Sequence, residues 1–69
     1  MFIIREAKET GYSKFNNCNT IRFDDEDGYR KSAACTEDLY VKCGDKVEIY
    51  TDAHVNYRGF RAMALRVVK

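Results

Sequence analysis

The chain has 69 residues, of which 45% are hydrophobic and 33% are charged, and its formal net charge is +1. This composition is typical of one small globular domain and excludes a disordered chain. The sequence has no apolar run near the roughly 18 residues of a membrane-spanning helix. The near-neutral charge neither requires nor excludes a nucleic-acid partner, because an acidic middle lies between two mildly basic ends.

The first residues do not resemble a secretory signal peptide. The apolar residues 1–4 are followed directly by Arg5 and Glu6, without a basic lead, a long apolar stretch or a small-residue cleavage site. The odd number of cysteines does not fit a framework of paired disulfides. We therefore expect a cytoplasmic protein whose reduced thiols pack as small apolar groups, at Cys18, Cys35 and Cys43.

Short β-type segments recur along the chain and are separated by turn-forming residues. Strands are predicted over residues 2–7, 20–23, 29–31, 39–41 and 46–51. Turns are predicted over residues 16–19, 24–28 and 44–45, and Gly11 is predicted to interrupt the β structure. The segment 32–37 stays open, because Ser32-Ala33-Ala34 also fits one helical turn.

The clearest strand is predicted over residues 46–51. Val47 and Ile49 alternate with Lys46 and Glu48, so that apolar side chains point one way and polar side chains the other. This alternation predicts an antiparallel sheet with one face on a core and one face in water.

The last segment, residues 60–68, fits two structures. As a strand it places Met63, Leu65 and Val67 on the inside, and as an amphipathic helix it also presents one apolar face. We favour the strand, because the segment ends in two valines and lacks a helix-capping residue.

The many short strands and the lack of a long helix predict an all-β fold. Five or six strands in 69 residues suit a small barrel, because closure removes the sheet edges that a tiny sheet cannot protect. We therefore predict one domain over residues 1–69, built as a small five-stranded OB-like barrel.

The carboxyl-terminal third is similar to the last two strands of cold-shock domains. The first of those strands carries a Gly-x-x-Val-x-Phe pattern, which residues 44–49 match except at the aromatic position. A basic–Gly pair follows, as in Arg58 and Gly59, and Ala62 and Leu65 stand at the family's spacing from that glycine. The resemblance implies an OB barrel that binds single-stranded RNA or DNA.

Two further segments extend this resemblance. Ser32-Ala33-Ala34 resembles the family's Ser-Ala-Ile turn, and residues 8–15 resemble its first stacking motif, Lys-Gly-Phe-Gly-Phe, with Ser13-Lys14 interrupting it. The second motif, Val-Phe-Val-His, has no counterpart beyond residues 28–31. The resemblance therefore implies the barrel more directly than the activity.

Aromatic and basic residues are interleaved at several places in the sequence. Single-stranded nucleic acid requires this combination, because flat rings stack on bases while cations follow the phosphates. The expected nucleic-acid-binding residues are Tyr12, Lys14, Phe15, Arg22, Phe23, Tyr29, Arg30, Lys31, Arg58, Phe60 and Arg61. The strands would carry the stacking face, and Arg58 and Arg61 would contact phosphates from its rim.

The same residues also have a simpler interpretation. Rings can form the core while cations keep the surface soluble. In that case the barrel binds a protein, as a small inhibitor or adaptor, and does not bind nucleic acid. Exposure of Tyr12, Phe15, Phe23 and Tyr29 on one common sheet face distinguishes the two interpretations.

A second resemblance leads to a third interpretation. Residues 50–62 are similar to the end of an extracellular CUB domain. That family implies a longer chain, a signal peptide and paired cysteines, so a CUB-like fragment would contain a disulfide.

The sequence indicates no metal site, cofactor or catalytic centre. Residues 24–27 are consecutive acids without the alternation of a calcium loop, and they are expected to form a solvated loop. The gaps between Cys18, Cys35, Cys43 and His54 differ from the short cysteine pairs that hold zinc. Because phosphate-binding loops and nucleophile motifs are missing as well, we expect a binding module and not an enzyme.

Overall fold

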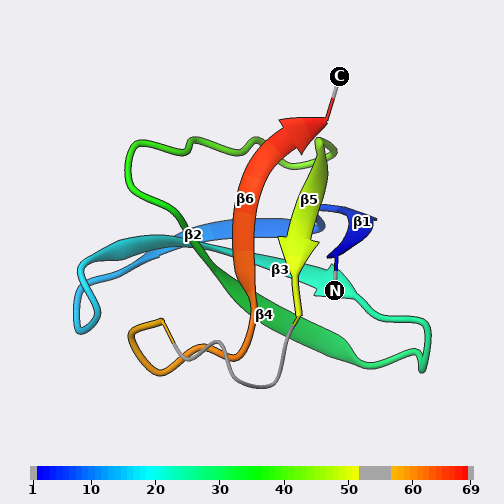
Figure 1. The fold of residues 1–69 in the computed structure, drawn as a ribbon, viewed down its shortest axis with the longest axis horizontal. Coiled ribbons are helices and arrows are strands. Elements are labelled where there is room, and N and C mark those ends of the chain that lie inside the picture. Colours follow the sequence, from blue (N-terminus) through cyan, green and yellow to red (C-terminus); the bar gives the residue numbers. More distant parts are fainter. Residues whose placement is uncertain (1, 52–56, 69) are drawn as a thin grey trace.

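The computed structural model describes residues 2–51 and 57–68 and is all-β, as the sequence predicts (Figure 1). Its strands are β1 (Phe2–Glu6), β2 (Glu9–Ser13), β3 (Cys18–Asp24), β4 (Arg30–Cys35), β5 (Lys46–Tyr50) and β6 (Met63–Val68). They form one mixed sheet in the order β1-β5-β6-β4-β3-β2, in which β4 and β6 run parallel and the other neighbours antiparallel. Among the described residues, no helix is long and apolar enough to cross a membrane.

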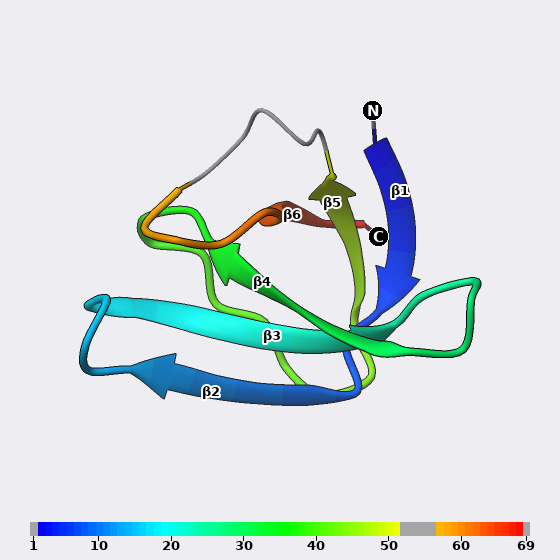
Figure 2. The same cartoon turned by 90° about the horizontal axis from the view of Figure 1, so that it is seen from below.

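The hydrogen-bonded order differs from the predicted closed barrel of five strands. The sheet has six strands, and its end strands are β1 and β2, which are consecutive in the chain. Between them, Ala7 exchanges backbone hydrogen bonds of 2.8 Å with Asp45 and Gly44, while the Lys8 N–H donates to the Arg22 carbonyl at 2.8 Å. The chain therefore changes its neighbour from β5 to β3 at this point, where Figure 2 shows it bending.

β2 runs through Gly11, where the sequence predicts a break. Gly11 lies opposite Thr20 of β3. A Cβ at this glycine would lie 3.5 Å from the Thr20 hydroxyl oxygen, an ordinary contact distance. The interruption falls instead at Ala7 and Lys8, because Ala7 bonds to the turn before β5 whereas Lys8 bonds to β3.

The segment 32–37, which the sequence leaves open, begins as a strand and not as a helical turn. β4 pairs with β3 on one side and with β6 on the other, and Ala33, Ala34 and Cys35 are all buried. Parallel pairing places Cys35 opposite Ala64. A central place in the sheet therefore makes this alanine-rich segment a strand, although alanine has a low strand propensity.

The predicted strand over residues 39–41 is wrong. These residues lie in the loop between β4 and β5 (Figure 1), and Leu39 and Val41 pack half-buried against the core. Leu39 and Val41 are therefore half-buried side chains of a loop that does not pair with a neighbouring strand.

The structure confirms the two strands predicted near the carboxyl terminus, as β5 and β6. Val47 and Ile49 are fully buried, as the alternation predicts. In β6 the fully buried residue is Ala64, because the register with β5 shifts between Glu48 and Ile49. The residues expected inside this strand are only half-buried: Met63, Leu65 and Val67.

The predicted Asp-Gly turn is confirmed between β3 and β4. Gly28 has a φ of 83°, and its N–H donates to the Asp25 carbonyl at 2.9 Å. The Asp25 N–H in turn donates to the Tyr29 carbonyl at 3.0 Å. This is a short hairpin loop that ends in a left-handed residue, which explains the glycine.

Candidate functional site

The aromatic residues expected to stack on bases do not share a sheet face. Phe23 is 1% exposed and belongs to the core, so its predicted place on a stacking face is wrong. Phe15 and Tyr29 are 98% and 71% exposed, but they lie in the turns at the two opposite ends of β3 (Figure 2). Tyr12 is 55% exposed on β2. The single face that nucleic-acid stacking requires is therefore not assembled.

Arg30 is the centre of an exposed ion-pair network. It pairs with Asp24 of β3 and with Glu9 of β2. The hydrogen bonds to Asp24 and then to Glu9 raise the pKa of the Arg30 guanidinium. Arg22, the next predicted cation, lies opposite Glu9 in the sheet. The surface across β2, β3 and β4 therefore carries balanced charges and not a free basic patch.

Lys31 is also paired, because it turns back onto the acidic run. Its ammonium lies 2.7 Å from Asp25 and 3.1 Å from Asp27. The hydrogen bond from Lys31 lowers the pKa of Asp25, and the pKa of Asp27 is lowered by the Tyr29 N–H and then by Lys31. The run expected to be a solvated loop is thus an exposed turn that binds the neighbouring cation.

Residues 57–60 form a tight turn. The Phe60 N–H donates to the Tyr57 carbonyl at 2.9 Å, and the central residues Arg58 and Gly59 have φ values of 51° and 85°. Two left-handed central residues are normally an Asn-Gly or Gly-Gly pair. An arginine at the first of these positions is therefore uncommon and costs backbone strain.

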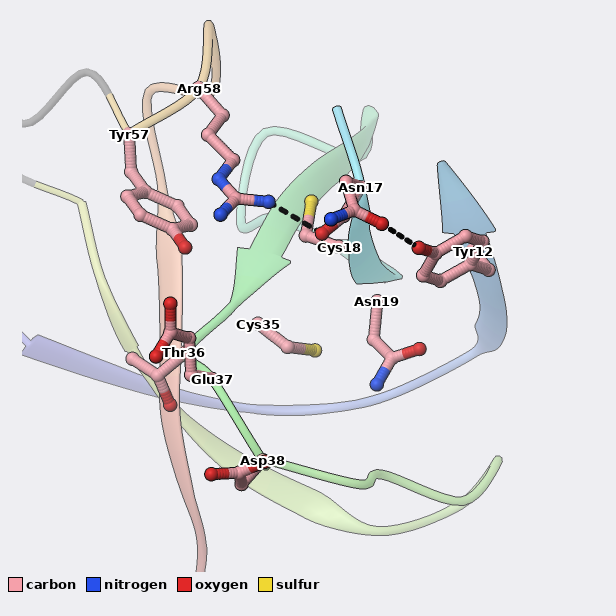
Figure 3. Close-up of a pocket in the computed structure, with 10 residues that line it drawn as sticks. All are labelled: Tyr12, Asn17, Cys18, Asn19, Cys35, Thr36, Glu37, Asp38, Tyr57 and Arg58. Carbon is pink, nitrogen blue, oxygen red and sulfur yellow. Dashed lines mark hydrogen bonds between the residues drawn. The ribbon is translucent and has the colours of Figure 1, made fainter. Parts of the chain in front are cut away.

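The Arg58 side chain connects this turn to the turn between β2 and β3. Its guanidinium donates to the backbone carbonyls of Asn16 and Asn17, and Figure 3 draws the bond to Asn17. It also lies 5.1 Å from the centre of the Tyr57 ring. The residue expected to contact phosphates is therefore engaged in joining two turns that are distant in the sequence.

A groove lies between these two turns, where Figure 3 shows its first hollow, and it continues along β2. It consists of two adjoining hollows of about 250 and 330 Å³, which share Tyr12, Asn19 and Cys35. Its lining includes Tyr12, Asn17, Asn19, Tyr40, Tyr57 and Arg58, together with residues 36–38. We refer to it as the tyrosine groove. The Tyr12 hydroxyl donates to the side-chain oxygen of Asn17, which fixes one wall.

Left-handed backbone conformations are concentrated at this groove. The non-glycine residues with positive φ in the described part of the chain are Asn17 at 55°, Asp38 at 65° and Arg58 at 51°, and all of them line it. Such a conformation costs free energy at Arg58, whereas asparagine and aspartate adopt it more readily. The clustering of these conformations at one hollow is typical of a functional site.

Two buried thiols lie against the groove, those of Cys18 and Cys35 (Figure 3). Burial, with a smaller contribution from Cys18, raises the pKa of Cys35 to about 11. This thiol is therefore protonated at neutral pH and is a poor nucleophile. Within residues 2–51 and 57–68, no cluster of His, Cys, Asp or Glu could hold a metal ion. His54 lies outside the described residues.

All three cysteines are free thiols, as the sequence analysis expects. Cys18 and Cys35 are buried, but Cys43 is exposed and its thiol donates to the Lys8 carbonyl at 3.0 Å. The disulfide that a CUB-like fragment implies is therefore not formed among them.

A larger hollow beside the β3–β4 turn gathers four of the predicted residues. Phe23, Lys31, Phe60 and Arg61 line a space of about 710 Å³. Asp25 lines it too and is paired with Lys31. Arg61 has no ion-pair partner among the described residues, whereas Lys31, the other cation of this hollow, is paired.

The tyrosine groove contains two of the predicted residues, Tyr12 and Arg58. Lys14 and Phe15 are exposed in the turn beside it. The polar lining residues that the sequence did not indicate come from separate segments without a common spacing, among them Asn17, Asn19, Glu37, Asp38 and Tyr40. Asn17 carried a local signal, because asparagine tolerates left-handed backbone. The turn predicted over residues 16–19 ends at Asn17, since Cys18 begins β3.

No family model matches the chain, and neither a curated protein nor a solved structure matches it. The protein is therefore characterised by its fold and its groove alone. It is a small all-β protein with a polar, tyrosine-lined groove between two clamped turns.

Proposed function

We propose that the sheet is a small five-stranded OB-like barrel. In this interpretation β1 and β2 are the two halves of one bent strand, which the hydrogen bonds at Ala7 and Lys8 support. The pairings then form a ring from this strand through β3, β4, β6 and β5 back to its first half. OB folds are partly open barrels of five strands.

The position of the groove supports the same interpretation. In OB folds, ligands bind at the loop between the first and second strands and at the loop between the fourth and fifth. In the proposed barrel, the first loop is the β2–β3 turn, and the second contains Tyr57 and Arg58. The tyrosine groove lies between these two segments.

We infer that the protein is a non-enzymatic binding module that holds a segment of a partner protein in the tyrosine groove. The observation that carries this proposal is the set of tyrosines and asparagines on a clamped backbone with left-handed residues. Tyrosine gives a large amphipathic contact area at a low entropic cost, and asparagine gives adaptable hydrogen bonds. Tyr12 and Tyr40 are 55% and 79% exposed, so both rings are available to a partner.

The charge of the groove favours a protein over nucleic acid. The basic residue that lines the groove is Arg58, and its guanidinium already donates to two carbonyls. Glu37 and Asp38 line the same groove and are exposed. Phosphates approaching this surface would meet carboxylates, while the one cation that the described residues place in the groove is already engaged.

The proposal predicts that peptide binding depends on a groove tyrosine and not on tyrosine exposure in general. Dodecapeptides selected from a random display library on the wild-type protein should bind Tyr40→Ala at least about fivefold more weakly. Tyr29→Ala is the matched control, because Tyr29 is 71% exposed outside the groove. It should leave the same dissociation constants within about twofold.

Isothermal titration of each selected peptide against the three proteins measures these constants. Peptides that bind Tyr40→Ala and the wild type equally well would show that partners bind elsewhere. A selection that yields no peptide at all would also contradict the proposal.

Single-stranded RNA or DNA is a second candidate ligand, supported by the hollow that gathers Phe60, Arg61 and Lys31. This function predicts binding of oligothymidine at low salt and a decline in affinity as salt rises. Arg61→Gln should weaken that binding and make its salt dependence shallower. Fluorescence anisotropy measures both, and wild-type affinity that is absent at low salt or insensitive to salt removes this candidate.

A further inference from the structure

The tyrosine groove holds carboxylates that the molecule itself does not neutralise. Glu37 and Asp38 line it, and neither has an ion-pair partner in the described part of the chain. Of the other described acids, Glu26 and Asp45 also lack an ion-pair partner, whereas six are paired with cations: Glu6, Glu9, Asp24, Asp25, Asp27 and Glu48. The groove therefore presents two adjacent, exposed carboxylates that no cation among the described residues neutralises.

The cation of the groove is held away from these carboxylates. The Arg58 guanidinium donates to the Asn16 and Asn17 carbonyls and lies over the Tyr57 ring. Figure 3 shows Arg58 beside Asn17 at one end of the hollow and Asp38 at the opposite end. The charge at that end is therefore available to a ligand.

The other walls also suit a positive charge. Figure 3 shows Tyr12 and Glu37 on opposite sides of the hollow, and Tyr40 lines its continuation. A tyrosine ring attracts a lysine ammonium or an arginine guanidinium through its negative face. The Tyr12 ring on one side and the Glu37 carboxylate on the other together complement a long cationic side chain.

We propose that the partner segment of this groove is basic, and that its lysine or arginine side chains bind between the tyrosine rings and the Glu37 and Asp38 carboxylates. This inference rests on the proposed protein-binding function and adds the chemistry of the partner. Glu37 and Asp38 are then specificity-determining residues, because they distinguish a basic segment from a neutral one.

The test uses three probes with the whole chain. They are an acetylated nonapeptide that alternates glycine and arginine, its counterpart with glutamine in place of arginine, and oligothymidine. Each is titrated into isotopically labelled protein, and the backbone amide signals in NMR spectra report both the affinity and the location of binding. The arginine peptide should shift groove amides, including that of Asn19, and should bind at least about fivefold more tightly than the glutamine peptide.

Two charge-neutralising variants test whether the Glu37 and Asp38 carboxylates bind the arginine peptide. Glu37→Gln and Asp38→Asn should each weaken the arginine peptide by about two- to fivefold and leave the glutamine peptide unchanged. Asparagine tolerates the left-handed backbone at position 38, where φ is 65°. Glu26→Gln is the matched control, because it removes the same charge from an exposed residue of the β3–β4 turn and should change neither affinity.

The outcomes separate this inference from the function on which it rests. Equal binding of the two peptides at the groove would overturn the basic partner and leave the protein-binding function standing. An equal loss of affinity in Glu26→Gln would show that overall charge, and not the groove, attracts the peptide, which also overturns the inference. Binding of oligothymidine without either peptide would overturn both, more so if Glu37→Gln strengthened it.

Discussion

Arg58 shows how one side chain can stabilise a strained backbone position. Its φ of 51° lies in the left-handed region, which costs a residue with a Cβ about 1–2 kcal/mol. In return its guanidinium makes two hydrogen bonds to the Asn16 and Asn17 carbonyls. Hydrogen bonds to charged groups contribute about 1.5–3 kcal/mol when well formed, and less at an exposed site such as this one. The two effects are of similar size, so the bonds can offset the strain.

Two substitutions of Arg58 separate these effects. Arg58→Ala loses the hydrogen bonds and keeps the strain, so the free energy of unfolding should fall by about 1–2 kcal/mol. Arg58→Asn loses the same bonds but suits the left-handed backbone, so it should be about 1 kcal/mol more stable than Arg58→Ala. Urea denaturation measures both free energies.

Arg61→Ala is the control for this comparison, because Arg61 is exposed and forms no ion pair among the described residues. Its stability should stay within about 0.5 kcal/mol of the wild type. Equal stabilities of Arg58→Ala and Arg58→Asn would argue against a strained turn at this position.

At the scale of single elements, the strands with clear alternation were predictable and the others were not. β5 follows from Val47 and Ile49, because every second residue points to the same face. β4 did not follow from its alanines, since its two neighbouring strands decide its structure. The strand predicted over residues 39–41 did not form, because no strand of the described sheet pairs with this segment.

For the candidate site too, the sequence predicts local structure better than the exposure of the side chains of β2 and β3. Their residue types predict strands and turns, but not which side of the sheet is covered. Phe23 became core because Ile21, Ala33 and Ala64 pack in the same cluster. Tyr12 stayed exposed beside the groove. Exposure of an aromatic residue depends on contacts with distant segments, so the stacking face could not be judged from the sequence.

At the scale of the whole molecule, the junction of β1 and β2 decides whether the sheet is a barrel with one bent first strand or a sheet with two separate edge strands. The amides of Ala7 and Lys8 donate to the Asp45 and Arg22 carbonyls at 2.8 Å. In a barrel with one continuous bent first strand, these bonds lie in its middle. In a sheet that simply ends in β1 and β2, they lie where two edge strands can open separately.

Hydrogen exchange distinguishes these two cases. In the proposed barrel, the amides of Ala7 and Lys8 should exchange as slowly as those of Ile21 and Ile49, because all of them open only in global unfolding. NMR measurement of amide exchange gives the opening free energy of each residue. Exchange at Ala7 and Lys8 that is more than about tenfold faster than in β3 and β5 would indicate separate edges and contradict the barrel.

The sequence by itself determined the features that depend on neighbours in the chain. The all-β class, the β5 strand and the Asp-Gly turn at Gly28 follow from alternation and from backbone preference, which are local properties. Only the tertiary structure decided which rings are buried, which cations are paired and where the tyrosine groove lies. The physical reason is that burial and hydrogen bonding depend on segments brought together in space. Arg58 shows this most directly, since its partners Asn16 and Asn17 belong to a turn at the other end of the sequence.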